Sequence, residues 1–345
     1  MPASSREKDS VHERLILHSS FRNTLEALRN ARIELPESTV NLDLTHDPPP
    51  DPSSQGTLAK IEEGGPFELH AVSGEGLAGR NLVCAYDESV KSFAALEGTA
   101  FLTSHSLVVA TPARWLPLNL MTLYFYTRSL RLQEVSEFIR QTQEPERQSK
   151  ADYQKDRLAF LLEFTPRNSI LLIDGPIIAG DEYTVFSDKI ARFHEKDILP
   201  VFLVKNSESD LVINNTPEIK GQFNSDLHWA NSILLPGNRT AFYRYTDSIR
   251  SKNSKVFAYL RSTKAGPTRV EFSVETVSRF GSLLSGLLDL LHYLILVQGD
   301  TRNPQARPIA IAERFARETQ KLIDLERVMR WAQLHPTMNQ ERFAW

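Results

Sequence analysis

The stretch "NSILLIDGPII", Asn168–Ile178, decides the fold because it leads a buried β-strand directly into an acidic residue. The residues 169–173 are typical of a strand, and Asp174 follows them. Gly175 and Pro176 predict a turn immediately afterwards. Two interpretations of Asp174 are open: it is a turn residue, or it binds a metal ion where a central strand ends.

A second strand ends in the same way. In "NLVCAYDES", residues 81–89, Asp87 and Glu88 follow an apolar run. The next runs are "SFAALEGTAFLTS" and "HSLVVATPA", and together the three predict an antiparallel meander from Asn81 to Ala110. "LMTLYFYTR", residues 120–128, adds a predicted edge strand. The chain therefore delivers acidic residues at the ends of two separate strands.

The remaining pattern alternates helices and strands. A helix is predicted at 185–196 and another buried strand at 198–206, so the order from the strand at 169–173 implies a parallel crossover. The runs 255–262 and 268–275 predict a late β pair. Helices are predicted at 10–33, in the second half of 132–164, at 276–297 and at 309–333, and 44–56 is a Pro-rich linker. The order predicts an α/β fold of the ribonuclease H-like class, a mixed sheet with helical elaborations at both ends. We expect a helix and linker over 1–56 and one domain over 57–345, with its core at about 80–275 and C-terminal helices at 276–335.

Composition narrows the class of protein. The 345 residues have a formal net charge of −3, so no global basic field predicts nucleic-acid binding, and any DNA contact has to be local. Cys84 is the single cysteine, which excludes an internal disulfide framework and a cysteine-based zinc site and suits a reducing cytoplasm. The polar N-terminus contains no apolar signal core. "LLSGLLDLLHYLILVQG" includes Asp289 and His292, which favours a buried helix over a membrane span.

The predicted topology makes the strands of Asp87 and Asp174 neighbours at the sheet centre. Carboxylates on rigid strands are suitable ligands for the hard cations Mg²⁺ and Mn²⁺. Two such ions about 3.5–4 Å apart activate water and stabilise the leaving oxygen in phosphodiester hydrolysis. A shared metal site therefore stands beside the turn interpretation of Asp174.

Several blocks of the sequence resemble the NurA family of nucleases. "LVCAYDESVKSFAALEGTAFLTSHSLVVA" and "SILLIDGPII" resemble the two family blocks in which a strand ends in an aspartate. "LPVFLVKNSESDLVIN", "SILLPGNRTAFY", "YLRSTKAGPTRVEFSVE" and "RPIAIAERFARE" resemble later blocks in the same order. The resemblance spans roughly 81–318 and implies a ribonuclease H-like nuclease.

Carried over by position, the resemblance makes Asp87 and Asp174 the metal-binding aspartates. The family glutamate on the preceding helix matches Asp156, with Glu163 as the alternative. In the C-terminal helix, Glu313 stands over the family histidine, and Gln305 over its tyrosine. Glu88 replaces a family glycine, so it is either a further ligand or the sign of an altered site.

Basic residues complete the prediction. Lys205, at the end of "PVFLVK", is expected to offset phosphate charge beside the metal, or to be simply solvated. Arg302 and Arg307 precede the Glu313 helix and are expected to contact DNA, although an exposed loop is an equal interpretation. Arg269 alternates with Val270 and so shares a sheet face with Glu271, where it either pairs with that acid or contacts DNA.

The resemblance implies a metal-dependent deoxyribonuclease that uses Mn²⁺ or Mg²⁺. It implies a homodimer, DNA as substrate, and a HerA-type hexameric ATPase as partner, in end resection for repair or phage defence. The expected reactions are 5′-to-3′ exonuclease or single-strand endonuclease cleavage. No ATP-binding motif occurs in the sequence, so motor activity has to come from the partner. Two alternatives remain: a nuclease-fold adaptor of the ATPase with an altered site, and a ribonuclease H-like RNase or integrase.

Overall fold

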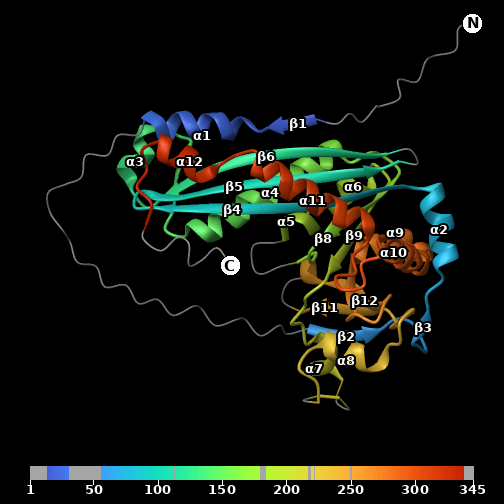
Figure 1. Cartoon of the computed structure of the whole chain (residues 1–345). Helices are drawn as coiled ribbons and strands as arrows, with labels where there is room; N and C mark the ends of the chain where they lie inside the picture. The colour runs from blue at the N-terminus through green and yellow to red at the C-terminus, as the bar shows by residue number, and fades with distance from the viewer. Residues whose placement is uncertain are drawn as a thin grey trace, which may run out of the picture.

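The computed structural model describes residues 14–30, 56–111, 114–178, 184–216, 219–220, 222–248 and 251–337. Within these ranges, thirteen strands join into one twisted mixed sheet (Figure 1). Its order is β1-β6-β5-β4-β8-β9-β13-β12-β10-β3, with β11 and β2 extending from β12 and β7 added to β6. The strands are β1 Arg14–Leu17, β2 Gly56–Lys60, β3 Phe67–Glu68, β4 Leu82–Ala95, β5 Gly98–Ala110, β6 Trp115–Thr127, β7 Ile139–Gln141, β8 Ser169–Asp174, β9 Ile198–Val204, β10 Asn238–Arg239, β11 Tyr243–Asp247, β12 Lys255–Arg261 and β13 Thr268–Ser273.

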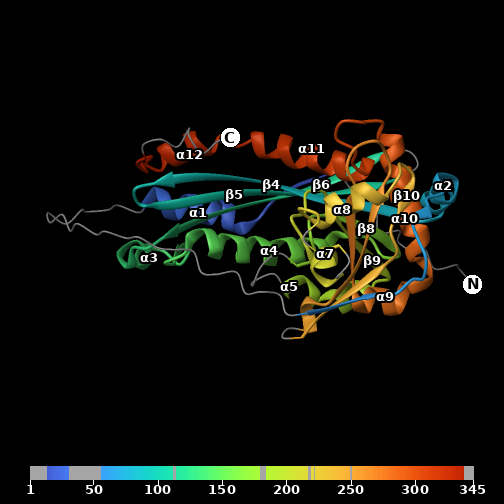
Figure 2. The same ribbon diagram turned by 90° about the horizontal axis from the view of Figure 1, so that it is seen from below.

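Helices cover both faces of this sheet. Figure 2 shows α11 and α12 along one face of β4–β6 and α4 along the other. The helices are α1 Ser19–Asn30, α2 Ala71–Arg80, α3 Leu130–Val135, α4 Pro145–Phe164, α5 Thr184–Ser187, α6 Ile190–His194, α7 Leu211–Asn215, α8 Asp226–Ile233, α9 Val274–Phe280, α10 Leu284–Gln298, α11 Arg307–Lys321 and α12 Leu325–Trp331, with 3₁₀ turns η1 Ser251–Asn253 and η2 Gly281–Leu283.

The central strand order confirms the predicted fold class. The strands β6, β5 and β4 form an antiparallel meander, and β8 and β9 then add in parallel beyond β4. This is the β-β-β-α-β-α-β plan of a ribonuclease H-like sheet, with α4 as the crossover helix between β7 and β8. The late pair β12 and β13 is antiparallel, as predicted, and β13 joins the same sheet through β9.

Alternating side chains give the sheet two cores. Val83 and Ala85 pack beneath α10 and α11, whereas Cys84 and Tyr86 pack against α4. Such alternation along β4 follows from the pleat, since successive side chains point to opposite faces. Along β4 or β8, every second side chain therefore packs against α10 and α11, and the side chains between them pack against α4.

Several boundaries differ from the predictions. The N-terminal helix prediction over 10–33 was wrong for Leu15 and Ile16, which belong to β1 and pair with β6. The meander consists of two long strands and one turn at 96–97 rather than three short runs. The strand predicted at the edge is β6, which lies between β5 and β1. The proposed linker at 44–56 lies outside the described residues except for Gly56, where β2 begins.

The helical predictions also divide into shorter elements. The stretch 132–164 contains α3, β7 and α4, and the helix predicted at 185–196 is two short helices, α5 and α6. The segment Val274–Gln298 is the one helical stretch of the described chain that is long and apolar enough to cross a membrane. Leu287, Leu288, Leu290 and Leu291 of this segment are buried in the core, which agrees with the predicted buried helix.

Candidate active site

Asp87 and Asp174 stand side by side where the parallel pairing of β4 and β8 ends; β8 ends at Asp174, whereas β4 continues to Ala95. Tyr86 of β4 is in register with Ile173 of β8, and the next residues along each strand are the two aspartates. Each aspartate is an even number of residues from strand residues that pack in the core beneath α11. Because side chains alternate along a strand, both carboxylates point to that face of the sheet. Adjacent strands lie about 4.8 Å apart, which brings the carboxylates close together.

Burial and neighbouring acids change the protonation of Asp87. Asp87 is buried, with 8% of its surface exposed. Burial, together with the negative charges of Asp174 and Glu88, raises the pKa of Asp87 from 3.8 to about 8. The Asp87 carboxylate also accepts a hydrogen bond of 2.8 Å from the Glu88 backbone N–H. A cation bound beside Asp87 would therefore favour its charged form.

Lys205 links Asp174 to the C-terminal helix. Its Nζ lies 2.6 Å from Asp174 Oδ2 and 4.0 Å from Glu313 Oε2. This geometry follows from the register, because Asp174 pairs with Leu203 and Lys205 lies two residues further along, on the same face. Glu313 also pairs with Arg317 and accepts a hydrogen bond of 3.1 Å from Gln305 Nε2. The structure thus brings Asp87, Asp174, Lys205 and Glu313 into one cluster.

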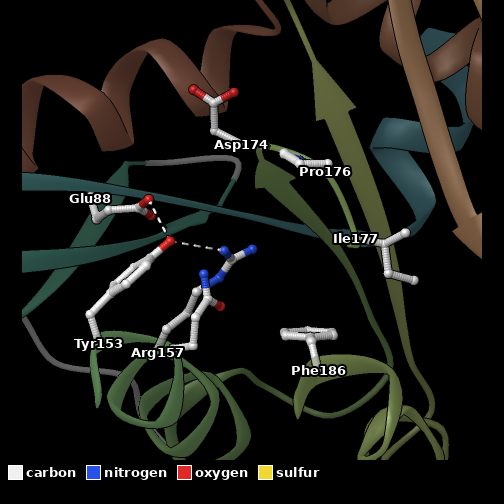
Figure 3. A pocket seen from close by; sticks show the side chains of 9 residues that line it. Glu88, Tyr153, Arg157, Asp174, Pro176, Ile177 and Phe186 are labelled. Carbon is white, nitrogen blue, oxygen red and sulfur yellow. Dashed lines mark hydrogen bonds between the residues drawn. The ribbon is translucent and has the colours of Figure 1, made fainter. Parts of the chain in front are cut away.

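Glu88 follows Asp87 within β4 and lies on the α4 side of the sheet. Figure 3 shows it beside a cavity of about 110 Å³ that Tyr153, Arg157 and Asp174 also line. The Tyr153 hydroxyl donates to Glu88 Oε1 (3.1 Å) and accepts from Arg157 Nη1 (3.4 Å). Burial raises the pKa of Glu88 despite the nearby Arg157 charge. Glu88 Oε2 is buried and has no hydrogen-bond partner within the described part of the chain.

The structure does not bring the predicted helix acids to this cluster. Asp156 is on α4, but its carboxylate accepts a hydrogen bond of 2.8 Å from the hydroxyl of Tyr124 on β6. Glu163 is exposed near the C-terminal end of α4, close to where β8 begins rather than where it ends. The metal-binding roles of Asp156 and Glu163 stay predictions that this geometry does not support, because α4 presents Tyr153 and Arg157 at the level of Asp174.

The predicted DNA contacts divide into exposed and buried residues. Arg302 and Arg307 are exposed, as expected. Arg269 is 5% exposed and its guanidinium lies 2.9 Å from Glu271 Oε1. The prediction of Arg269 as a DNA contact was wrong, and the alternative of pairing with Glu271 is the observed one, because both side chains lie within the sheet interior.

Sequence reasoning missed how the turn after Asp174 is fixed. Glu271 Oε2 accepts a hydrogen bond of 2.9 Å from the backbone N–H of Ile177. Its other oxygen pairs with Lys255 at 2.6 Å and with Arg269. A buried ion cluster on β12 and β13 therefore holds the turn that follows β8. The sequence did hold a signal for this cluster, namely one acidic residue, Glu271, together with two basic residues, Lys255 and Arg269, on a predicted pair of strands.

The chemistry of the acids fits a hard divalent cation. The donors would be carboxylate oxygens of Asp87, Asp174, Glu313 and Glu88, which Mg²⁺ and Mn²⁺ prefer. The raised pKa of Asp87 and the unpartnered Glu88 Oε2 both favour positive charge here. Among the described residues, however, no three or more His, Cys, Asp or Glu side chains already form a metal-binding group. The residue types therefore suit a hard divalent cation, but within the described part of the chain no three of them are placed to share one.

Comparisons with known proteins place this geometry in context. A family model described as the NurA domain matches residues 51–318. The fold is similar to that of the NurA nuclease from Sulfolobus solfataricus, with 10% identity, 72% of this chain and 85% of that chain covered, and a TM-score of 0.47.

Two endonuclease V structures are similar as well. One is the endonuclease V of Ciona intestinalis in complex with a 24mer DNA containing an inosine. It is 14% identical, the match covers 71% of this chain and 87% of that chain, and the TM-score is 0.33. That of Bacillus subtilis has 10% identity, 74% and 84% coverage, and a TM-score of 0.36. No curated protein sequence matches the chain.

Proposed function

Because this chain belongs to the NurA domain family, we propose that it is a DNA nuclease that cleaves phosphodiester bonds beside Asp87 and Asp174. The register of β4 and β8 is the observation that supports this function most directly. It places two carboxylates on one face of two rigid neighbouring strands, where β8 ends. Hydrolytic nucleases need such an arrangement of hard ligands.

We further propose that the reaction depends on Mn²⁺ or Mg²⁺. Asp87 and Asp174 would hold the ion, with Glu313 and Glu88 as additional ligands. When bound, such ions polarise the phosphodiester and make water a better nucleophile. Lys205 supplies a positive charge within reach of the same site and can offset charge on the phosphate oxygens. Glu271, through Ile177, keeps the turn after Asp174 in place.

The family resemblance extends the proposal to partners. We propose a homodimer that acts on DNA ends with a HerA-type hexameric ATPase in the cytoplasm, in repair or phage defence. The net charge of −3 supports a division of labour in which the partner supplies much of the grip on DNA. Cleavage is expected to be 5′-to-3′ exonucleolytic, endonucleolytic on single strands, or both.

A nuclease-fold adaptor is the second candidate. It is favoured by one observation, namely that α4 presents Tyr153 and Arg157 beside Glu88 while Asp156 bonds to Tyr124. In that case the site would bind the ATPase partner and DNA without hydrolysis.

The test is cleavage of linear DNA with Mn²⁺, with and without the ATPase, by wild type and Asp174→Asn. Nuclease function predicts that Asp174→Asn lowers the rate by more than about 100-fold, as for loss of a group that stabilises charge in the transition state. Glu318→Gln, an exposed acid on the same helix as Glu313, is the matched control. Binding of Mn²⁺ by calorimetry supplies a readout independent of activity. Equal inactivity of wild type and Asp174→Asn with the partner present would favour the adaptor.

A further inference from the structure

A second cavity lies at the start of β4, five residues before Asp87. It measures about 620 Å³, within the usual range for ligand sites. We call it the aromatic groove; its walls come from α2, α10 and the first residues of α11, which Figure 1 shows together at one end of the molecule, and its floor from the starts of β4 and β6. The residues used below are Glu75, Arg80, Leu82, Trp115, Tyr293 and Arg307.

Two aromatic rings line this groove. Trp115 begins β6 and Tyr293 lies on α10, and each is partly buried. Both pack on one side against the hydrophobic core beneath α10 and α11. The rings are thereby held in fixed orientations while part of each remains accessible from the cavity. Rigid aromatic rings of this kind are platforms on which unpaired bases stack.

The same groove carries positive charge. Arg80 and Arg307 are exposed and line it together with one acid, Glu75. The Arg307 guanidinium lies 5.9 Å from the centre of the Trp115 ring. Within the described ranges, neither arginine forms an ion pair with a carboxylate, and Arg80 donates only from Nε, to the Gly76 carbonyl. Both guanidinium groups are therefore free to bind phosphate oxygens.

We propose that the aromatic groove binds an unpaired segment of a DNA strand, with bases on Trp115 and Tyr293 and phosphates on Arg80 and Arg307. The combination of aromatic rings with unpaired arginines is the chemistry by which single strands are held without sequence preference. This inference rests on the proposed function, since it gives the nuclease a place to hold a strand away from the scissile bond.

The geometry sets a distance for this contact. Leu82 lines the groove, and Asp87 lies five residues further along the same strand. At about 3.3 Å per residue the two are separated by about 17 Å. A stacked strand advances about 3.4 Å per nucleotide, so the groove holds bases about five nucleotides from the reacting phosphate.

The experiment measures binding of a fluorescent single-stranded 12-mer to the full chain by anisotropy, in chelator so that nothing is cleaved. The variants are Trp115→Leu, Tyr293→Leu and the double substitution Arg80→Gln with Arg307→Gln. Arg327→Gln on α12, an exposed arginine at the far end of the molecule, is the matched control. Thermal melting of every variant verifies that it is folded.

Loss of either ring is expected to weaken binding by about 30-fold, as for one lost base–aromatic stack. Loss of both arginines is expected to reduce the slope of log K against log salt by about 1.4, which corresponds to two phosphate contacts with a single strand. Arg327→Gln is expected to bind as wild type does. A 12-mer duplex is expected to compete poorly with the single strand.

Three results would overturn the inference. The first is a folded set of ring and arginine variants that binds the 12-mer like wild type, or a wild type that does not bind it. The second is equal competition by free thymidine monophosphate, which would make the groove a mononucleotide site. The third is variants that keep DNA binding but lose association with the ATPase, which would make it a protein-docking surface. Failure of the nuclease proposal shows separately, as absence of cleavage with Mn²⁺.

Discussion

Replacing Glu271 by glutamine should destabilise the protein strongly, because this carboxylate has two buried cationic partners. Glu271 is fully buried, 2.6 Å from Lys255 Nζ and 2.9 Å from Arg269 Nη2. Lys255 and Arg269 are themselves buried, 8% and 5% exposed. Glutamine keeps the size of the side chain but removes the charge that both cations contact.

The magnitude follows from these distances. With an effective dielectric constant near 20, each pair attracts by about 6 kcal/mol. Much of that attraction is offset by the desolvation of the ions, and breaking one partner of a buried pair typically costs about 3–5 kcal/mol. We expect Glu271→Gln to lower the free energy of unfolding by that amount at pH 7.

The pH dependence has a definite sign. Burial raises the pKa of Glu271, but the charges of Lys255 and Arg269 outweigh burial and hold it below its ordinary value of 4.5. A carboxyl with a lowered pKa in the folded state stabilises the fold above the unfolded pKa, and this contribution is lost as the pH falls through the folded pKa. The difference between wild type and Glu271→Gln should therefore shrink in acid.

Chemical denaturation followed by tryptophan fluorescence measures this effect through the midpoint and slope of unfolding. Glu275→Gln, an exposed acid four residues away, is the control and should change the free energy of unfolding by less than about 1 kcal/mol. If the free energy of unfolding of Glu271→Gln stays within about 1 kcal/mol of wild type at pH 7, the charge of Glu271 does not stabilise the buried Lys255 and Arg269, and the prediction is wrong.

Three further predictions concern buried polar groups and close packing. Burial lowers the pKa of His105 from 6.5 to about 3, so proton uptake by this residue in the unfolded chain should cost about 2 kcal/mol of stability between pH 7 and pH 5, and His105→Gln should gain about that amount relative to wild type over the same range in pH-dependent denaturation. A Cβ at Gly74 would lie 2.1 Å from the Asp289 carbonyl oxygen, so Gly74→Ala should cost about 1–3 kcal/mol in thermal unfolding, whereas Gly79→Ala on the same helix meets nothing within 4 Å and should be neutral or slightly stabilising. Tyr153→Phe removes a hydroxyl that joins Glu88 to the buried Arg157 and should cost about 1–3 kcal/mol, measured by denaturation at pH 7; an unchanged midpoint would contradict this bond.

The end of β8 was predictable from sequence because strand and turn chemistry are local. The apolar run before Asp174 and the turn residues after it sufficed to place Asp174 at the end of a strand. The prediction that a strand ends at Asp87 was wrong, because β4 continues to Ala95 as one arm of the long hairpin with β5. The adjacency of Asp87 and Asp174 required the order of the strands, which the alternation of helices and strands supplied. The short strands β2, β3, β7 and β10 were not predictable, because they are too short to show a period.

The helix contribution to the site could not be read from hydrophobic periodicity. Tyr153, Asp156 and Arg157 are all at least partly buried, so the apolar pattern does not show which of them faces the strand end. Geometry would have helped. β8 spans about 17 Å, which equals about 11 helical residues at 1.5 Å each, and counting back from Phe164 reaches Tyr153.

Asp87 and Asp174 lie beside each other only while the number of residues before Asp87 in β4 is unchanged. The site therefore depends on that length as well as on the identity of the two acids. One residue inserted or deleted between Leu82 and Asp87 would turn the Asp87 carboxylate from the α11 face to the α4 face, because side chains alternate with a period of two. The fold could survive such a change while the pair of acids would not. Lengthening the β4–β5 hairpin at its tip, Leu96–Glu97, leaves the level of both acids untouched. Relatives of this chain should therefore vary in length at the hairpin tip and keep the spacing from the start of β4 to its aspartate.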